Sequence, residues 1–124
     1  MPQLKWDETD FLNCLEVLPT IDEFETGYHY SVSKDGFRLQ LSVFQFDSDI
    51  AITVYRAGVA RPVIAFTIKD CSGTRYVNDS RGEYLEFAPS QVFGDRYQRD
   101  YLIPVGVRLS VKPSICVELF AQRT

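Results

Sequence analysis

Few residues in this 124-residue chain have side chains that could act on a substrate. The chain contains a single histidine, His29, and three cysteines that lie far apart in the sequence, Cys14, Cys71 and Cys116. A nucleophile such as Cys71 needs a base to activate it, and His29 is the only imidazole in the sequence. Because none of these residues lies in a recognisable catalytic motif, we predict that the protein is not an enzyme and has no catalytic residues.

Aspartates at predicted turns offer a different chemistry, the coordination of a metal ion. Asp47 and Asp49 flank one turn, and Asp70 and Asp79 lie on others. If several turns meet at one end of a β-sandwich, their carboxylates could bind Ca²⁺. Aspartate is also favoured at turns because its side chain hydrogen-bonds the turn backbone. We prefer the second interpretation and predict neither a metal site nor a cofactor.

The best candidate for a binding site is the segment 93–101. It places Arg96, Tyr97, Arg99 and Tyr101 close together in a stretch without clear helical or strand periodicity. Arginine and tyrosine anchor many protein interfaces, because each combines a large stacking area with directed hydrogen bonds. The alternative is a surface loop whose tyrosines pack on the domain and whose charges pair locally. We select these four residues as the predicted binding site.

The elements that must position these residues are mostly β-strands. Apolar residues occupy every second position in 37–43 and in 105–111, which predicts strands with one buried and one solvated face. About eight strands separated by short turns, with no helices between them, favour an all-β antiparallel β-sandwich, with a barrel as second choice. The other predicted strands cover 28–32, 50–55, 63–68, 74–77, 83–87 and 115–120.

The strand that begins at Phe37 changes its pattern near its end. Leu41 and Val43 predict one buried face, whereas Phe44 and Phe46 place apolar side chains at the alternate positions, which belong to the opposite face. This change predicts either a bulge that shifts the register or a second covered face.

One short helix is predicted, over about residues 7–18. Asp7 is a good N-cap, and acidic residues follow in the first turn, where the helix dipole favours negative charge. Pro19 is expected to end the helix. Because so short a helix is marginal alone, it must dock an apolar stripe on the rest of the domain, at an open end or an edge. That stripe consists of Phe11, Cys14, Leu15 and Leu18.

Length and charge narrow the classes of partner. A chain of this length predicts one globular domain over residues 1–124. The net charge is −4, and the first 26 residues hold seven acidic side chains against one lysine. An acidic chain repels nucleic acid and anionic lipid, so we predict neither as a partner.

With no secretory signal and no apolar run of membrane-spanning length, a soluble, cytoplasmic protein is expected.

These observations predict a non-enzymatic binding module that acts through a protein partner or through copies of itself. An inhibitor, an immunity-type protein or an accessory subunit would fit that description. The alternative is a β-sandwich or barrel that binds a sugar, a lipid or a small metabolite in a pocket lined by tyrosines. Neither the partner nor the ligand is identified by the sequence.

Overall fold

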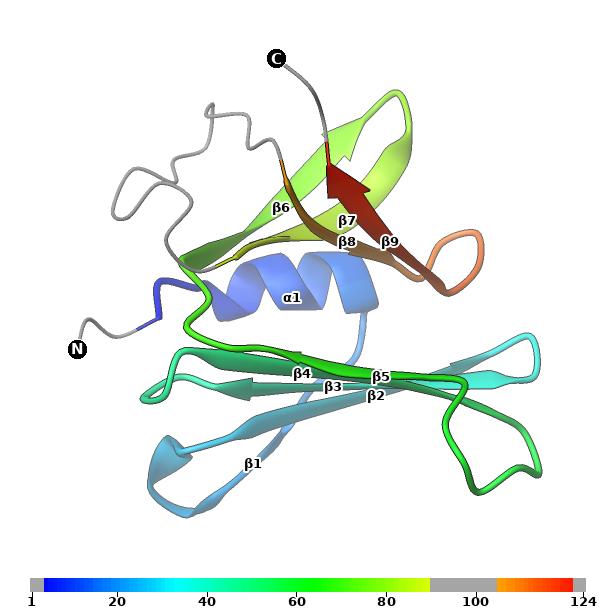
Figure 1. Ribbon diagram of the computed structural model, residues 1–124, viewed down its shortest axis with the longest axis horizontal. Helices are drawn as coiled ribbons and strands as arrows, with labels where there is room; N and C mark the ends of the chain where they lie inside the picture. The colour runs from blue at the N-terminus through cyan, green and yellow to red at the C-terminus, as the bar shows by residue number, and fades with distance from the viewer. Residues whose placement is uncertain (1–3, 90–104, 122–124) are drawn as a thin grey trace.

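A computed structural model describes residues 4–89 and 105–121, which form two antiparallel β-sheets (Figure 1). The strand order is β1-β2-β3-β4-β5 in one sheet and β6-β7-β8-β9 in the other. The predicted all-β antiparallel sandwich is confirmed, and the described strands do not close into a barrel. The strands are β1 (Thr20–Ile21), β2 (Tyr28–Lys34), β3 (Phe37–Phe44), β4 (Asp49–Arg56), β5 (Ile64–Ile68), β6 (Gly73–Asp79), β7 (Gly82–Ala88), β8 (Val105–Ser110) and β9 (Cys116–Ala121).

The five-stranded sheet is built from hairpins whose alternation sets its buried face. Between β2 and β3, Asp35 and Gly36 have φ angles of 54° and 81°, the left-handed conformations that a two-residue hairpin turn requires. Leu41 lies opposite Tyr30 on β2 and Ile52 on β4, and all three side chains are buried. This row lies at the centre of the apolar face that the sheet turns toward the core.

The end of β3 differs from the sequence-based prediction. The pairing of β3 with β4 runs without a bulge up to Phe44, which lies opposite Asp49, and the strand stops there. Phe46 lies in the following turn with 54% of its surface exposed. The prediction of a bulge or a second covered face was wrong because the alternation was extended past the last paired residue.

The single α-helix of the described residues, α1 (Glu8–Leu15), lies between the two sheets rather than at an open end or an edge (Figure 1). The ring of Phe11 packs against Tyr30 of one sheet and Phe87 of the other, with centroid distances of 5.4 and 6.2 Å. Asp7 is the N-cap, as predicted, because its carboxylate accepts a hydrogen bond of 2.8 Å from the Thr9 N–H.

The helix ends earlier than Pro19 requires. Glu16 adopts a left-handed conformation with φ 59° and returns its N–H to the Leu12 carbonyl, which terminates α1 at Leu15. Leu18 is 79% exposed and therefore does not belong to the buried apolar stripe. The chain then continues as β1 and a short 3-10 helix, η1 (Glu23–Glu25), before it enters β2. Among the described residues, no helix has the length and apolar character needed to span a membrane.

Candidate functional site

The predicted binding residues Arg96, Tyr97, Arg99 and Tyr101 lie outside the described residues. Arginines and tyrosines do come together elsewhere, on the outer face of the four-stranded sheet. A second polar group surrounds His29 on the outer face of the five-stranded sheet.

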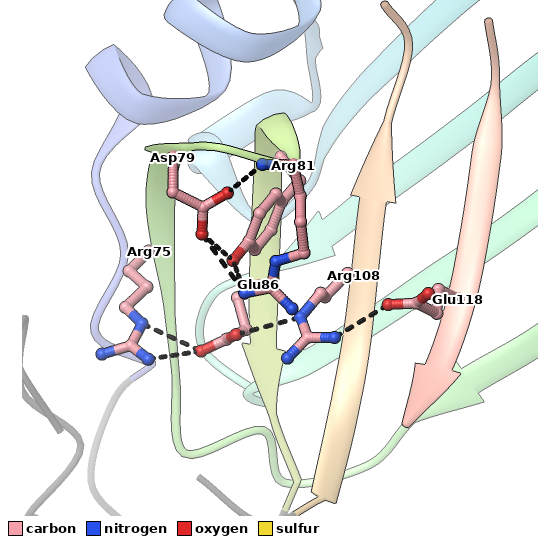
Figure 2. A network of polar contacts seen from close by, with 7 residues as sticks. Arg75, Asp79, Arg81, Glu86, Arg108 and Glu118 are labelled. Atoms are coloured by element: carbon pink, nitrogen blue, oxygen red, sulfur yellow. Dashed lines mark hydrogen bonds and ion pairs between the residues drawn. The ribbon is translucent and has the colours of Figure 1, made fainter. Parts of the chain in front are cut away.

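A row of alternating charges crosses the four-stranded sheet (Figure 2). Each strand contributes one residue, and the four lie directly opposite one another: Arg75 on β6, Glu86 on β7, Arg108 on β8 and Glu118 on β9. Glu86 accepts from Arg75 at 2.9 Å and lies 3.5 Å from the Nε atom of Arg108. The Nη1 atom of Arg108 donates to Glu118 at 2.8 Å. We call these four residues the charge ladder.

The centre of the charge ladder is buried. The Glu86 side chain is 4% exposed, and those of Arg75 and Arg108 are each 12% exposed. The guanidinium of Arg108 also stacks over the Phe120 ring, 3.8 Å from its centroid. A buried carboxylate is stable only when charge and hydrogen bonds compensate it: Arg75 provides both, and Arg108 provides charge, because its Nε atom has no hydrogen-bond partner among the described residues. The charges of the ladder are therefore largely satisfied within the sheet.

Another set of polar contacts lies at the turn between β6 and β7. Asp79 accepts hydrogen bonds from the Arg81 backbone N–H at 2.8 Å and from the Tyr84 hydroxyl at 3.0 Å. The hydrogen bond from the Arg81 backbone N–H, together with the hydrogen bond and positive charge of the Arg81 guanidinium, holds the pKa of Asp79 below its ordinary value. Asp79 thus stabilises its own turn, as the preferred interpretation of the turn aspartates predicted.

Asp49, the first residue of β4, braces a different connection, the one that follows β5. Asp49 forms an ion pair of 3.0 Å with Lys69 and accepts a hydrogen bond from the Asp70 N–H. Within residues 4–89 and 105–121, no group of three or more histidine, cysteine or acidic side chains is placed to hold a metal ion.

His29 points outward from β2, and both of its ring nitrogens have partners. Nδ1 lies 2.8 Å from the Ser42 hydroxyl, and Nε2 lies 2.8 Å from the Asp22 carboxylate. These three residue types also form catalytic triads, but a triad needs donors for the developing oxyanion. Ser42 lies within β3, which is paired on both sides, so the backbone N–H groups near it serve the sheet. The group ties the connector that carries Asp22 to the sheet.

That connector, residues 22–27, is further fixed by hydrogen bonds. The Asp22 N–H donates to the Gly27 carbonyl at 2.8 Å, and the Glu25 N–H donates to the Asp22 carbonyl at 2.9 Å. The Gln45 side chain donates to the Glu25 carbonyl at 2.7 Å and accepts from the Trp6 indole at 3.2 Å. Sequence reasoning missed this arrangement; the only signal was the acidic composition of the segment.

The three cysteines differ in exposure. Cys14 and Cys71 are buried, whereas Cys116 is exposed. Burial raises the pKa of the Cys14 thiol to about 11 and that of Cys71 to about 12, so neither forms the reactive thiolate at neutral pH.

Thiol labelling checks this placement. With Ellman's reagent at pH 8, we expect Cys116 to react quickly in the folded protein and Cys14 and Cys71 to react only after unfolding in guanidinium chloride. The variant Cys116→Ser should therefore lose the fast reaction. Fast reaction of a second thiol in the folded protein would contradict the assigned burial.

An open groove of about 530 Å³ lies where the β2–β3 turn meets the connection that follows β4. Its lining includes Arg38, Tyr55 and Arg56, and the Arg38 guanidinium lies 4.6 Å from the centroid of the Tyr55 ring. The predicted small-ligand alternative calls for a pocket lined by several tyrosines. This groove contributes one, and an arginine stacks on it, so the groove gives that alternative little support.

Comparisons with known proteins give one informative result. No protein-family model matches the chain, and no curated protein matches it. Among solved structures, the fold is similar to that of a chain in a contact-dependent growth inhibition toxin–immunity protein complex from Klebsiella pneumoniae 342. The TM-score is 0.74 with 18% sequence identity, and the match covers 96% of this chain and 97% of the other. At this identity the similarity shows a shared fold.

Proposed function

We propose that this protein is a non-enzymatic binding protein of the immunity type, which neutralises a protein toxin by forming a complex with it. The observation that carries this proposal is the fold similarity to a chain of a toxin–immunity protein complex over nearly the whole length of both chains. Because one fold can serve many functions, the similarity supports the proposal only together with features of this chain.

The state of the reactive side chains supports a binding role. Cys14 and Cys71 are buried and their thiols have raised pKa values, while His29 is held between Asp22 and Ser42 on a paired sheet. These groups are used in packing and in bracing the fold. A rigid sandwich whose polar groups stabilise its own fold suits recognition of a preformed partner surface.

The proposal also specifies where and with what the protein acts. The partner is a toxin domain encoded by a neighbouring gene, and the complex forms in the cytoplasm, the compartment that the sequence predicts. The segment 93–101, with its two arginines and two tyrosines, remains a candidate contact.

A growth assay tests this function. The toxin domain encoded next to this protein is induced in bacteria with and without the protein, and we expect growth to arrest only without it. The destabilised variant Leu41→Asp serves as the control and should not protect. Growth arrest in the presence of folded protein, or a neighbouring gene that encodes no toxin, would contradict the proposal.

A further inference from the structure

We infer that the connector, residues 22–27, contacts the toxin with Phe24 as its central anchor, and that the surface it contacts on the toxin is an apolar pocket rimmed by basic residues. This inference rests on the proposed function and specifies the chemistry of the partner.

The first observation is the exposure of Phe24. Its side chain is 82% exposed, the largest value for a large apolar residue in the described part of the chain. An isolated exposed apolar residue needs no explanation by itself. Phe24, however, also has φ 61° and ψ 18°, a left-handed conformation that is unfavourable for a bulky side chain. Glycine or asparagine would adopt it more easily, so the fold gains nothing from phenylalanine here.

The second observation is that the connector is held rigidly in this strained shape. His29 binds the Asp22 carboxylate, and Gln45 binds the Glu25 carbonyl. Gly27 is required for the close approach, because a Cβ atom there would lie 2.5 Å from Asp22 Oδ2 and 2.9 Å from His29 Nε2. Strain that surrounding contacts over-determine is characteristic of functional sites, and a preorganised aromatic loses little entropy on binding.

The third observation concerns charge. Glu23 and Glu25, on either side of Phe24, are exposed and have no hydrogen bond or ion pair from their carboxylates to another described residue. By contrast, Glu86 and Glu118 are paired in the charge ladder. Residues 16–26 include four acidic side chains and neither lysine nor arginine. The unpaired carboxylates around an aromatic anchor fit an apolar pocket rimmed by lysine and arginine.

Two other exposed apolar side chains precede the connector in the sequence. Leu18 is 79% exposed and Ile21 is 47% exposed. The outer face of the four-stranded sheet competes less well as the contact surface, because the charge ladder compensates its charges internally.

The experiment is calorimetric titration of the purified toxin domain with the wild-type protein and matched variants. Phe24→Ala should raise the dissociation constant about 30-fold or more, the loss of affinity typical of an interface hot spot. Leu119→Ala, which truncates a side chain that is 70% exposed on β9, should change the constant less than about twofold. Glu23→Gln and Glu25→Gln together should weaken binding and reduce its salt dependence, whereas Asp35→Asn should do neither.

A second variant separates binding from folding. Phe24→Gly relieves the left-handed strain, so its guanidinium denaturation midpoint should be equal to or higher than that of the wild type while it loses affinity as Phe24→Ala does. Wild-type affinity in both Phe24 variants would overturn the inference and leave the proposed function intact. A wild-type protein that does not bind the toxin domain would refute the proposed function, and the inference with it.

Discussion

Replacing Leu41 with aspartate is expected to cost about 4 kcal/mol or more of folding free energy, enough to unfold much of the protein. Leu41 is fully buried at the centre of the five-stranded sheet, between Tyr30 and Ile52. A carboxylate there would lose its water and gain no positively charged partner. Urea denaturation followed by circular dichroism measures the loss.

Two further variants make the Leu41 prediction robust. Leu41→Ala leaves a cavity without adding charge and should cost about 2–5 kcal/mol, which stays measurable if the aspartate variant does not fold. Gln40→Asp places the same charge one residue away, on the exposed face of β3, and should change stability by about 0.5 kcal/mol or less. Equal stability of Leu41→Asp and the wild type would show that the buried face is assigned wrongly.

Replacing Glu86 with glutamine is expected to destabilise the protein by about 3 kcal/mol. The change keeps the shape of the side chain but leaves Arg75 and Arg108, both largely buried, without the carboxylate between them. Removing one partner of a buried ion pair is costly because the remaining buried charges lose its attraction, although Arg108 keeps its ion pair with Glu118. Urea denaturation at low and high salt measures the effect, which should persist at high salt because the group is shielded from solvent.

Glu118→Gln is the matched control for Glu86. Glu118 ends the same charge ladder, but its side chain is 55% exposed. An exposed ion pair contributes little, so the loss should be below about 1 kcal/mol. Equal losses for the two glutamates would indicate that burial does not govern the energetics of the ladder.

The fold was largely predictable because β3 and β4 alternate strictly between buried and more exposed positions. In β3 and β4 the buried positions follow one parity, which is sufficient to predict strands and their core face. The two-residue strand β1 escaped prediction because two residues carry no period. The position of α1 between the sheets was not predicted either. Its apolar stripe indicates that this face of the helix must be buried but does not indicate which elements pack against it.

The candidate sites were less predictable because they depend on register and backbone conformation. Glu86 is an ordinary polar position in the sequence; its burial follows only from the pairing that places Arg75 and Arg108 opposite it. Phe24 seemed an unremarkable residue in an acidic connector until its left-handed φ and its exposure were known. The predicted residues Arg96 and Arg99 lie outside the described residues and stay a prediction.

The most direct test of the proposed function is to titrate the protein into an activity assay of the toxin domain encoded beside it. An immunity-type protein that binds tightly should reduce toxin activity in proportion to its concentration and abolish it near about one molar equivalent. Toxin activity that is unchanged at about a tenfold excess of folded protein would contradict the account.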